Sequence, residues 1–231
     1  MKRVLVTGGT SGIGLALAKG FAEAGWWVTG AGLDSEAAAA RDSGLEVIEL
    51  DVTAPTAVEA CLARFDSLDA LVNAAGVIRR HEELKPEVFE AVVDVNLNGA
   101  MRCCAAARPL LAASGGSIIN IASMLSFFGG GVVPGYSASK GGIAQLTKSL
   151  AIAWAGEGIR VNALAPGWIA TPMTQPLRED PAREQAILSR TPMARWGRPE
   201  ELVGPALFLA SEAASFVTGA VLTVDGGYSI M

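Results

Sequence analysis

Short apolar or β-branched runs alternate with longer helical stretches along the whole 231-residue chain. This alternation is typical of βαβ units that build a parallel sheet. The pattern predicts strands at residues 3–6, 27–31, 46–50, 70–72, 117–121, 160–164 and 221–224. It predicts helices near residues 13–24, 35–42, 54–64, 86–113, 136–156 and 199–211.

The longest segment between regular elements runs from residue 168 to 198 and carries several prolines, with one short helix predicted around residues 182–189. A loop of this length in a compact domain is usually functional, and often a lid over a site. No linker, repeat or low-complexity segment interrupts the pattern. We therefore expect residues 1–231 to form a single domain, with a substrate lid at 168–198.

Composition narrows the class of protein. Apolar residues make up 51% and charged residues 18%, which indicates a compact globular chain. A net charge of −5 gives no basic field for nucleic acid. No apolar run reaches the ~18 residues of a membrane span, and the apolar start is too short for a signal peptide. We expect a cytoplasmic protein without membrane or nucleic-acid partners.

Metal chemistry is disfavoured by the residues available. The three cysteines, Cys61, Cys103 and Cys104, lack the spacing of a zinc site, and His81 is the only histidine. We expect reduced, buried cysteines and no metal centre.

A glycine-rich turn follows the first predicted strand and precedes the first predicted helix. Such a turn lets the backbone approach a pyrophosphate, which rests on the helix N-terminus. Because a Gly-rich turn can also be a close-packed connection, its position after the first strand is what favours a dinucleotide. No Gly-Lys-Ser/Thr follows, so an ATP-type loop is disfavoured. The predicted contacts are Gly8, Ser11, Gly12, Ile13 and Gly14.

Tyr136 and Lys140 lie four residues apart on the first turn of a predicted helix, and Ser123 lies thirteen residues upstream. Residues at this spacing share one helix face. Making a phenol useful near neutrality requires roughly 4 kcal/mol, about what one charge at ~4 Å supplies at an effective dielectric of ~20. The pair could equally be an ordinary surface Tyr and Lys, and the rest of the chain decides between these interpretations.

The ordered set of Thr7-Gly8-x-x-x-Gly12-x-Gly14, Asn73 to Gly76, Asn96, Ser123, Tyr136-x-x-x-Lys140 and Pro166-Gly167 resembles the short-chain dehydrogenase/reductase family over essentially the whole chain. The resemblance implies a Rossmann-type, doubly wound, seven-stranded parallel sheet with helices on both faces, and a homotetramer. The terminal Asp225-Gly226-Gly227 matches a signature near the tetramer contacts.

The resemblance also implies roles for individual residues. Tyr136 would be the acid-base group, Lys140 would lower its pKa and hold the nicotinamide ribose, Ser123 would bind the substrate oxygen, and Asn96 would anchor a water. Asn96 is a mild misfit within a predicted helix, which favours a functional reason for it. The implied cofactor contacts beyond the glycine turn are Asp51, Val52, Asn73, Ala74, Gly76, Tyr136, Lys140, Pro166, Gly167, Ile169 and Thr171. Asp51 could equally cap the next helix.

The cofactor prediction rests on the end of the second strand. Gly32 occupies the position that often carries an acid for the adenosine ribose, and Asp34 follows two residues later. Asp34 could bind the ribose or cap the next helix. No Arg or Lys stands at residues 9–11 or 31–34 to receive a 2′-phosphate. We therefore expect NAD rather than NADP.

The substrate prediction is a small molecule. Residues 75–80, 121–127, 195–197 and 202–205 are similar to the 2-deoxy-D-gluconate 3-dehydrogenase and gluconate 5-dehydrogenase branch, which implies oxidation of a secondary alcohol on a sugar acid. Arg79, Arg80, Arg178 and Arg195 are candidates for its carboxylate, although exposed arginines are common. The alternatives are a 3-oxoacyl-[acyl-carrier-protein] reductase and a catalytically silent nucleotide-binding sensor or scaffold.

Overall fold

The computed structural model describes residues 1–33 and 45–231, so the helix expected at 35–42 and Asp34 lie outside the described residues. Seven strands form one sheet in the order β3-β2-β1-β4-β5-β6-β7, and every pair is parallel. The strands are β1 Arg3–Thr7, β2 Trp27–Gly32, β3 Glu46–Glu49, β4 Ala70–Asn73, β5 Ser117–Ile121, β6 Arg160–Pro166 and β7 Val221–Val224. The predicted Rossmann-type fold is confirmed.

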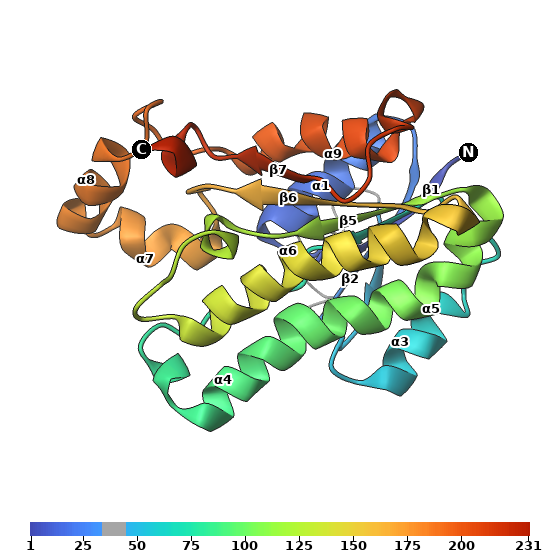
Figure 1. Cartoon of the computed structure of the whole chain (residues 1–231), viewed down its shortest axis with the longest axis horizontal. Coiled ribbons are helices and arrows are strands. Elements are labelled where there is room, and N and C mark those ends of the chain that lie inside the picture. Colours follow the sequence, from blue (N-terminus) through green and yellow to red (C-terminus); the bar gives the residue numbers. More distant parts are fainter. Residues whose placement is uncertain (34–44) are drawn as a thin grey trace.

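Helices cover both faces of the sheet (Figure 1). On one face lie α1 (Gly12–Glu23) and α9 (Val203–Ala210), and on the other lie α3 (Pro55–Leu62), α5 (Gly99–Ser114) and α6 (Pro134–Trp154). Alternation along β1 divides the core, because successive side chains of a strand point to opposite faces. Val4 and Val6 pack with Phe21 of α1, whereas Leu5 packs with Leu111 of α5.

The prediction of one uninterrupted α-helix over 86–113 is wrong, because a wider turn divides it. The structure has α4 (Pro86–Val93), then a π-helical turn over Asp94–Asn98, then α5. The wider turn brings the Asn96 amide to the main chain of Val77. Wide turns of this kind occur often at functional sites.

The segment 168–198 holds more structure than expected. The predicted helix is present as α8 (Pro181–Ser189), and a second short helix, α7 (Gln175–Arg178), precedes it. The two ends of the segment are joined, since Gly197 donates to the Trp168 carbonyl at 2.9 Å and Ala170 donates to the Gly197 carbonyl at 2.8 Å. Both helices lie at the end of the molecule where α6 begins (Figure 1).

None of the helices in the described part of the chain has both the length and the apolar character needed to cross a membrane.

Candidate active site

Tyr136 and Lys140 lie in the first turns of α6, which begins at Pro134. Proline suits the first helical position because its fixed φ matches the helix and its missing N–H has no partner to lose. Lys140 is only 4% exposed, and its Nζ donates to the Ile121 carbonyl at 2.6 Å. The same Nζ lies 5.6 Å from the centre of the Tyr136 ring. The predicted pairing on one helix face is therefore present.

Burial dominates the electrostatics of this pair. Burial raises the pKa of Tyr136, whereas a hydrogen bond from Ser123 and the positive charge of Arg80 lower it. Burial also lowers the pKa of Lys140 to about 8. A buried environment disfavours the charged form of each group, and Lys140 directs its proton to a carbonyl rather than to the phenol. Lys140 is not among the groups that lower the pKa of Tyr136 in this arrangement, so its expected effect on the phenol stays a prediction.

Ser123 follows β5 and starts a 3₁₀ turn over Met124–Ser126. Its Oγ accepts the Leu125 N–H at 3.1 Å, and Ser126 Oγ accepts the Ser123 N–H at 3.2 Å while donating to the Lys140 carbonyl at 2.6 Å. This small network attaches the serine turn to α6. It fixes the Ser123 hydroxyl beside the Tyr136 phenol.

Asn96 is 2% exposed and its amide is fully engaged. Its Oδ1 accepts the Val77 N–H at 2.8 Å, and its Nδ2 donates to the Val77 carbonyl at 3.0 Å and to Ser139 Oγ at 3.1 Å. Ser139 in turn donates to the Tyr136 carbonyl at 2.8 Å. Asn96 thus connects the loop after β4 to the catalytic helix; the water it was expected to anchor stays a prediction.

A groove of about 170 Å³ leads from the glycine turn to Tyr136 and Lys140. Its floor requires glycine: a Cβ at Gly14 would lie 2.0 Å from the Gly8 carbonyl oxygen, and one at Gly8 would lie 2.7 Å from the Ala75 nitrogen. The N-cap of α1, Ser11, makes no side-chain capping bond. A helix start with this open approach fits a pyrophosphate, so the residues present fit a dinucleotide.

Most of the predicted cofactor contacts line this groove. They are Gly8, Ser11, Gly12, Ile13, Gly14, Ala74, Gly76, Tyr136, Lys140 and Thr171. Three further lining residues, Ile121, Pro172 and Met173, were not predicted. Ile121 could have been found from its place at the carboxyl end of a central strand, where ligands of such sheets bind.

The remaining predicted contacts lie outside the groove. Asn73 turns its side chain into the core, where Nδ2 donates to Asn120 Oδ1 at 2.9 Å, so only its main chain faces away from the core network. Asp51 accepts from the Thr53 N–H at 2.8 Å, whereas α3 has Ala54 as its N-cap; the capping alternative is therefore wrong. Val52 is buried. Whether Asp51 and Val52 meet the adenosine end stays a prediction, as it does for Asp34.

Pro166 is the last residue of β6 and pairs with Val224 of β7, and Gly167 and Ile169 follow it. A Cβ at Gly167 would lie 2.6 Å from Asp225 Cα, and Gly167 donates to the Val224 carbonyl at 3.0 Å. Ile169 is 4% exposed and lines a separate cavity of about 420 Å³ with Trp168, Arg195 and Glu201. That larger cavity contains neither Tyr136 nor Lys140, so these two candidate catalytic residues lie at the smaller groove.

The four candidate arginines differ in their exposure and in their contacts. Arg80 is part-buried, its charge acts on Tyr136, and its Nη1 donates to the Met173 carbonyl at 3.4 Å. Arg195 is held by Glu201 at 2.7 and 2.8 Å. Arg79 is exposed, with its Nη1 3.5 Å from the adjacent Ile78 carbonyl. Arg178 lies on α7 and lines neither cavity. Like Arg178, Arg80 lines neither cavity, but of the four it is the arginine whose charge acts on Tyr136.

Comparison with known proteins agrees with this geometry. A family model described as Enoyl-(Acyl carrier protein) reductase matches residues 8–229. The chain is 44% identical to 2-dehydro-3-deoxy-D-gluconate 5-dehydrogenase of Pseudoalteromonas atlantica, over 98% of this chain and 95% of the relative. It is 43% identical to galactitol 2-dehydrogenase (L-tagatose-forming) of Cereibacter sphaeroides, over 97% of this chain and 94% of the relative.

Among solved structures, a gluconate 5-dehydrogenase from Burkholderia cenocepacia in complex with NADP and tartrate superimposes with a TM-score of 0.93 at 38% identity, covering 100% of this chain and 96% of that one. These similarities extend over the whole sheet and the groove rather than over one motif. The chain is therefore a member of the short-chain dehydrogenase/reductase family, whose resemblance the sequence motifs had indicated.

Proposed function

We propose that this protein interconverts a secondary alcohol and a ketone on a sugar acid, using a nicotinamide cofactor. The observation that carries the proposal is the pairing of Tyr136 and Lys140 at the end of a glycine-floored groove, with Ser123 beside the Tyr136 phenol. All four groups of the predicted catalytic set, Asn96 included, are present and buried or part-buried, which disfavours a silent scaffold. The curated relatives reported above bear the names of sugar-acid and polyol dehydrogenases.

The chemistry of the chain follows from this arrangement. A bound nicotinamide would supply the hydride acceptor or donor. During oxidation, the Tyr136 phenolate removes the proton of the substrate hydroxyl, and during reduction the phenol returns it. Ser123 donates to the substrate oxygen where negative charge develops. Lys140 and the groove glycines would hold the ribose and pyrophosphate.

We assign Arg80 as the residue that binds the carboxylate of the substrate. Its guanidinium is placed by the loop after β4, lies near Tyr136, and contacts the lid segment through Met173. Arginine binds a carboxylate through two parallel N–H groups, which also fixes orientation. An acyl-carrier-protein substrate would instead require a basic docking surface, and the net charge of −5 does not favour one.

For the cofactor we propose NAD. The support is local: no Arg or Lys stands at residues 9–11 or 31–34 to receive a 2′-phosphate. The Burkholderia relative holds NADP, so the comparison of kcat/KM for the two cofactors is decisive. A tenfold preference for NADP would contradict the proposal.

A substrate screen tests the function directly. NAD-linked oxidation should be measured across sugar acids, polyols, hydroxysteroids and 3-hydroxyacyl thioesters, in wild type, Arg80→Met and the control Arg79→Met. We expect the highest kcat/KM for a sugar acid and a loss of about tenfold or more in Arg80→Met, as for a charged hydrogen bond. A preference for thioesters, or equal effects of the two variants, would contradict the assignment.

A further inference from the structure

Glu83 is a buried carboxylate with an unusual pair of partners. It is 1% exposed and lies in the 3₁₀ turn Glu82–Leu84. Its Oε1 accepts the Arg79 N–H at 2.7 Å, and its Oε2 accepts the Tyr136 N–H, also at 2.7 Å. Among the described residues, no Lys or Arg forms an ion pair with it. Each carboxylate oxygen therefore accepts one main-chain N–H. Tyr136 lies 53 residues after Glu83 in the sequence.

The Tyr136 partner is the third residue of α6, so its N–H has no acceptor within the helix. The helix N-terminus favours a negative charge there, which offsets part of the cost of burying a carboxylate without a cation. Gly135 permits the close approach, because a Cβ at that position would lie 3.3 Å from Glu83 Oε2 and 3.2 Å from Phe89 Cα. The contact is built into the packing of the helix start.

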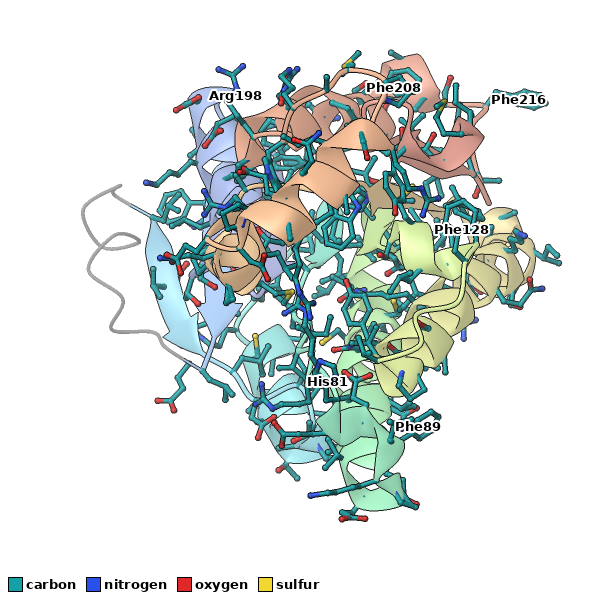
Figure 2. All side chains as sticks on the ribbon, turned by 90° about the vertical axis from the view of Figure 1, so that its left-hand side faces the viewer. His81, Phe89, Phe128, Arg198, Phe208 and Phe216 are labelled. Atoms are coloured by element: carbon teal, nitrogen blue, oxygen red, sulfur yellow. The ribbon has the colours of Figure 1, made fainter. Side chains whose placement is uncertain are left out.

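The Arg79 partner immediately precedes Arg80. Beyond Arg80, His81 takes a left-handed backbone with a φ of 68°, which is uncommon for a residue other than glycine, and its N–H donates to the Val132 carbonyl at 2.8 Å. Figure 2 shows His81 on the surface of this end of the molecule. Such strain persists only where surrounding contacts impose it, and it is found often at functional sites. The chain around Arg80 is thus held on both sides.

We propose that Glu83 is a positioning residue that fixes the distance between the substrate-binding Arg80 and the acid-base Tyr136. One carboxylate bridges the two main-chain segments that carry these side chains, so a movement of either segment relative to the other breaks one of its hydrogen bonds. The consequence is selectivity: the carboxylate of a sugar acid is held at one set spacing from the carbon whose hydroxyl meets the phenol. This inference rests on the proposed function.

A helix cap alone would explain only half of the geometry. A residue that merely stabilised α6 would affect every substrate equally, because Tyr136 acts on all of them. A residue that sets the spacing affects substrates with a carboxylate more than neutral substrates of the same carbon skeleton.

The experiment compares D-gluconate with D-glucitol as paired probes. The ratio of their kcat/KM values should be measured in wild type, Arg80→Met, Glu83→Gln, the double variant, and Glu82→Gln as the exposed control from the same turn. Glutamine has one acceptor oxygen and cannot accept both amides. We expect the ratio to fall about tenfold in Arg80→Met and in Glu83→Gln, with no further fall in the double variant, as for coupled residues. An equal loss for both probes in Glu83→Gln would overturn the proposal.

Amide hydrogen exchange provides a second measurement that needs no substrate. In Glu83→Ala, or in Glu83→Met where the alanine variant does not fold, exchange at both Arg79 and Tyr136 should quicken relative to Glu82→Gln. Faster exchange at Tyr136 alone would reduce Glu83 to a cap and overturn the proposal. If wild type oxidises neither probe, the proposed function fails, while the exchange result still decides whether Glu83 bridges the two segments.

Discussion

Lys140 lies beneath the Tyr136 ring, with its Nζ 5.6 Å from the ring centre, and it gives its hydrogen bond to the Ile121 carbonyl instead of to the phenol. Burial shifts the pKa of each of these two groups in the direction that favours its neutral form. Binding a cationic pyridinium nearby would favour the phenolate by adding positive charge.

Burial of Lys140 should lower the stability of the folded protein. Burial lowers its pKa from 10.5 to about 8, a penalty of about 3 kcal/mol, against which its hydrogen bond contributes about 1–3 kcal/mol. Lys140→Met should abolish turnover yet raise Tm at pH 7 by about 2–4 °C, whereas Lys148→Met, on the exposed face of α6, should leave both unchanged.

The pH dependence of the free energy of unfolding tests the same effect of burying Lys140. Between pH 8 and 10.5 the unfolded chain still binds a proton that folded Lys140 has released. The free energy of unfolding of wild type should therefore rise with pH in this window, relative to Lys140→Met. Urea unfolding at several pH values measures the difference. A wild type that is more stable than Lys140→Met at pH 7, with parallel pH profiles, would refute the account.

Ser123 can be tested spectroscopically because the chain has two tyrosines, Tyr136 and Tyr228. In a Tyr228→Phe background, tyrosinate absorbance reports Tyr136 alone. Ser123→Ala removes the hydrogen bond that lowers the pKa of Tyr136, so the titration midpoint should move to higher pH and kcat should fall about 10²–10³-fold. Ser149→Ala, which changes an exposed serine on α6, is the control. An unchanged titration midpoint in Ser123→Ala would remove Ser123 from the site.

The glycine floor predicts a contrast between two alanine substitutions. In Gly14→Ala the new Cβ would meet the Gly8 carbonyl at 2.0 Å, so the turn must open and cofactor affinity should fall at least tenfold, about 1.4 kcal/mol. Gly204, on α9, has open space around it, and Gly204→Ala should retain affinity and gain stability. Cofactor fluorescence titration measures both. Equal affinities would mean that the cofactor does not use this turn.

The homotetramer remains a prediction that the exposed surface can test. Phe216 is fully exposed and Phe208 partly so, and both lie along the α9 side beside the edge strand β7 (Figures 1 and 2). Large exposed apolar side chains of this kind mark interaction surfaces. Sedimentation velocity should give a tetramer for wild type and smaller species for Phe216→Asp. A stable wild-type monomer would defeat the prediction.

The sequence predicted the sheet and the placement of Tyr136 and Lys140 on one helix face, because these follow from local patterns. Strand runs, the glycine turn and the Tyr136–Lys140 spacing need no knowledge of distant contacts. It could not predict the break at Asn96, which depends on Val77 in another loop. It also could not foresee the direction of the pKa of Tyr136, since that is decided by burial, nor the contact of Glu83 with the Tyr136 N–H, 53 residues away in the sequence.

The substitution Tyr136→Phe tests the central claim most directly, with Tyr228→Phe as its matched control. Removing one phenolic oxygen leaves the groove and its glycines intact, so nicotinamide cofactor affinity should change by less than about twofold, while kcat should fall by about 10²–10⁴-fold or more, as expected for loss of a positioned acid-base group. Tyr228→Phe should keep both values. Turnover in Tyr136→Phe equal to wild type, on any alcohol that wild type oxidises, would contradict the account.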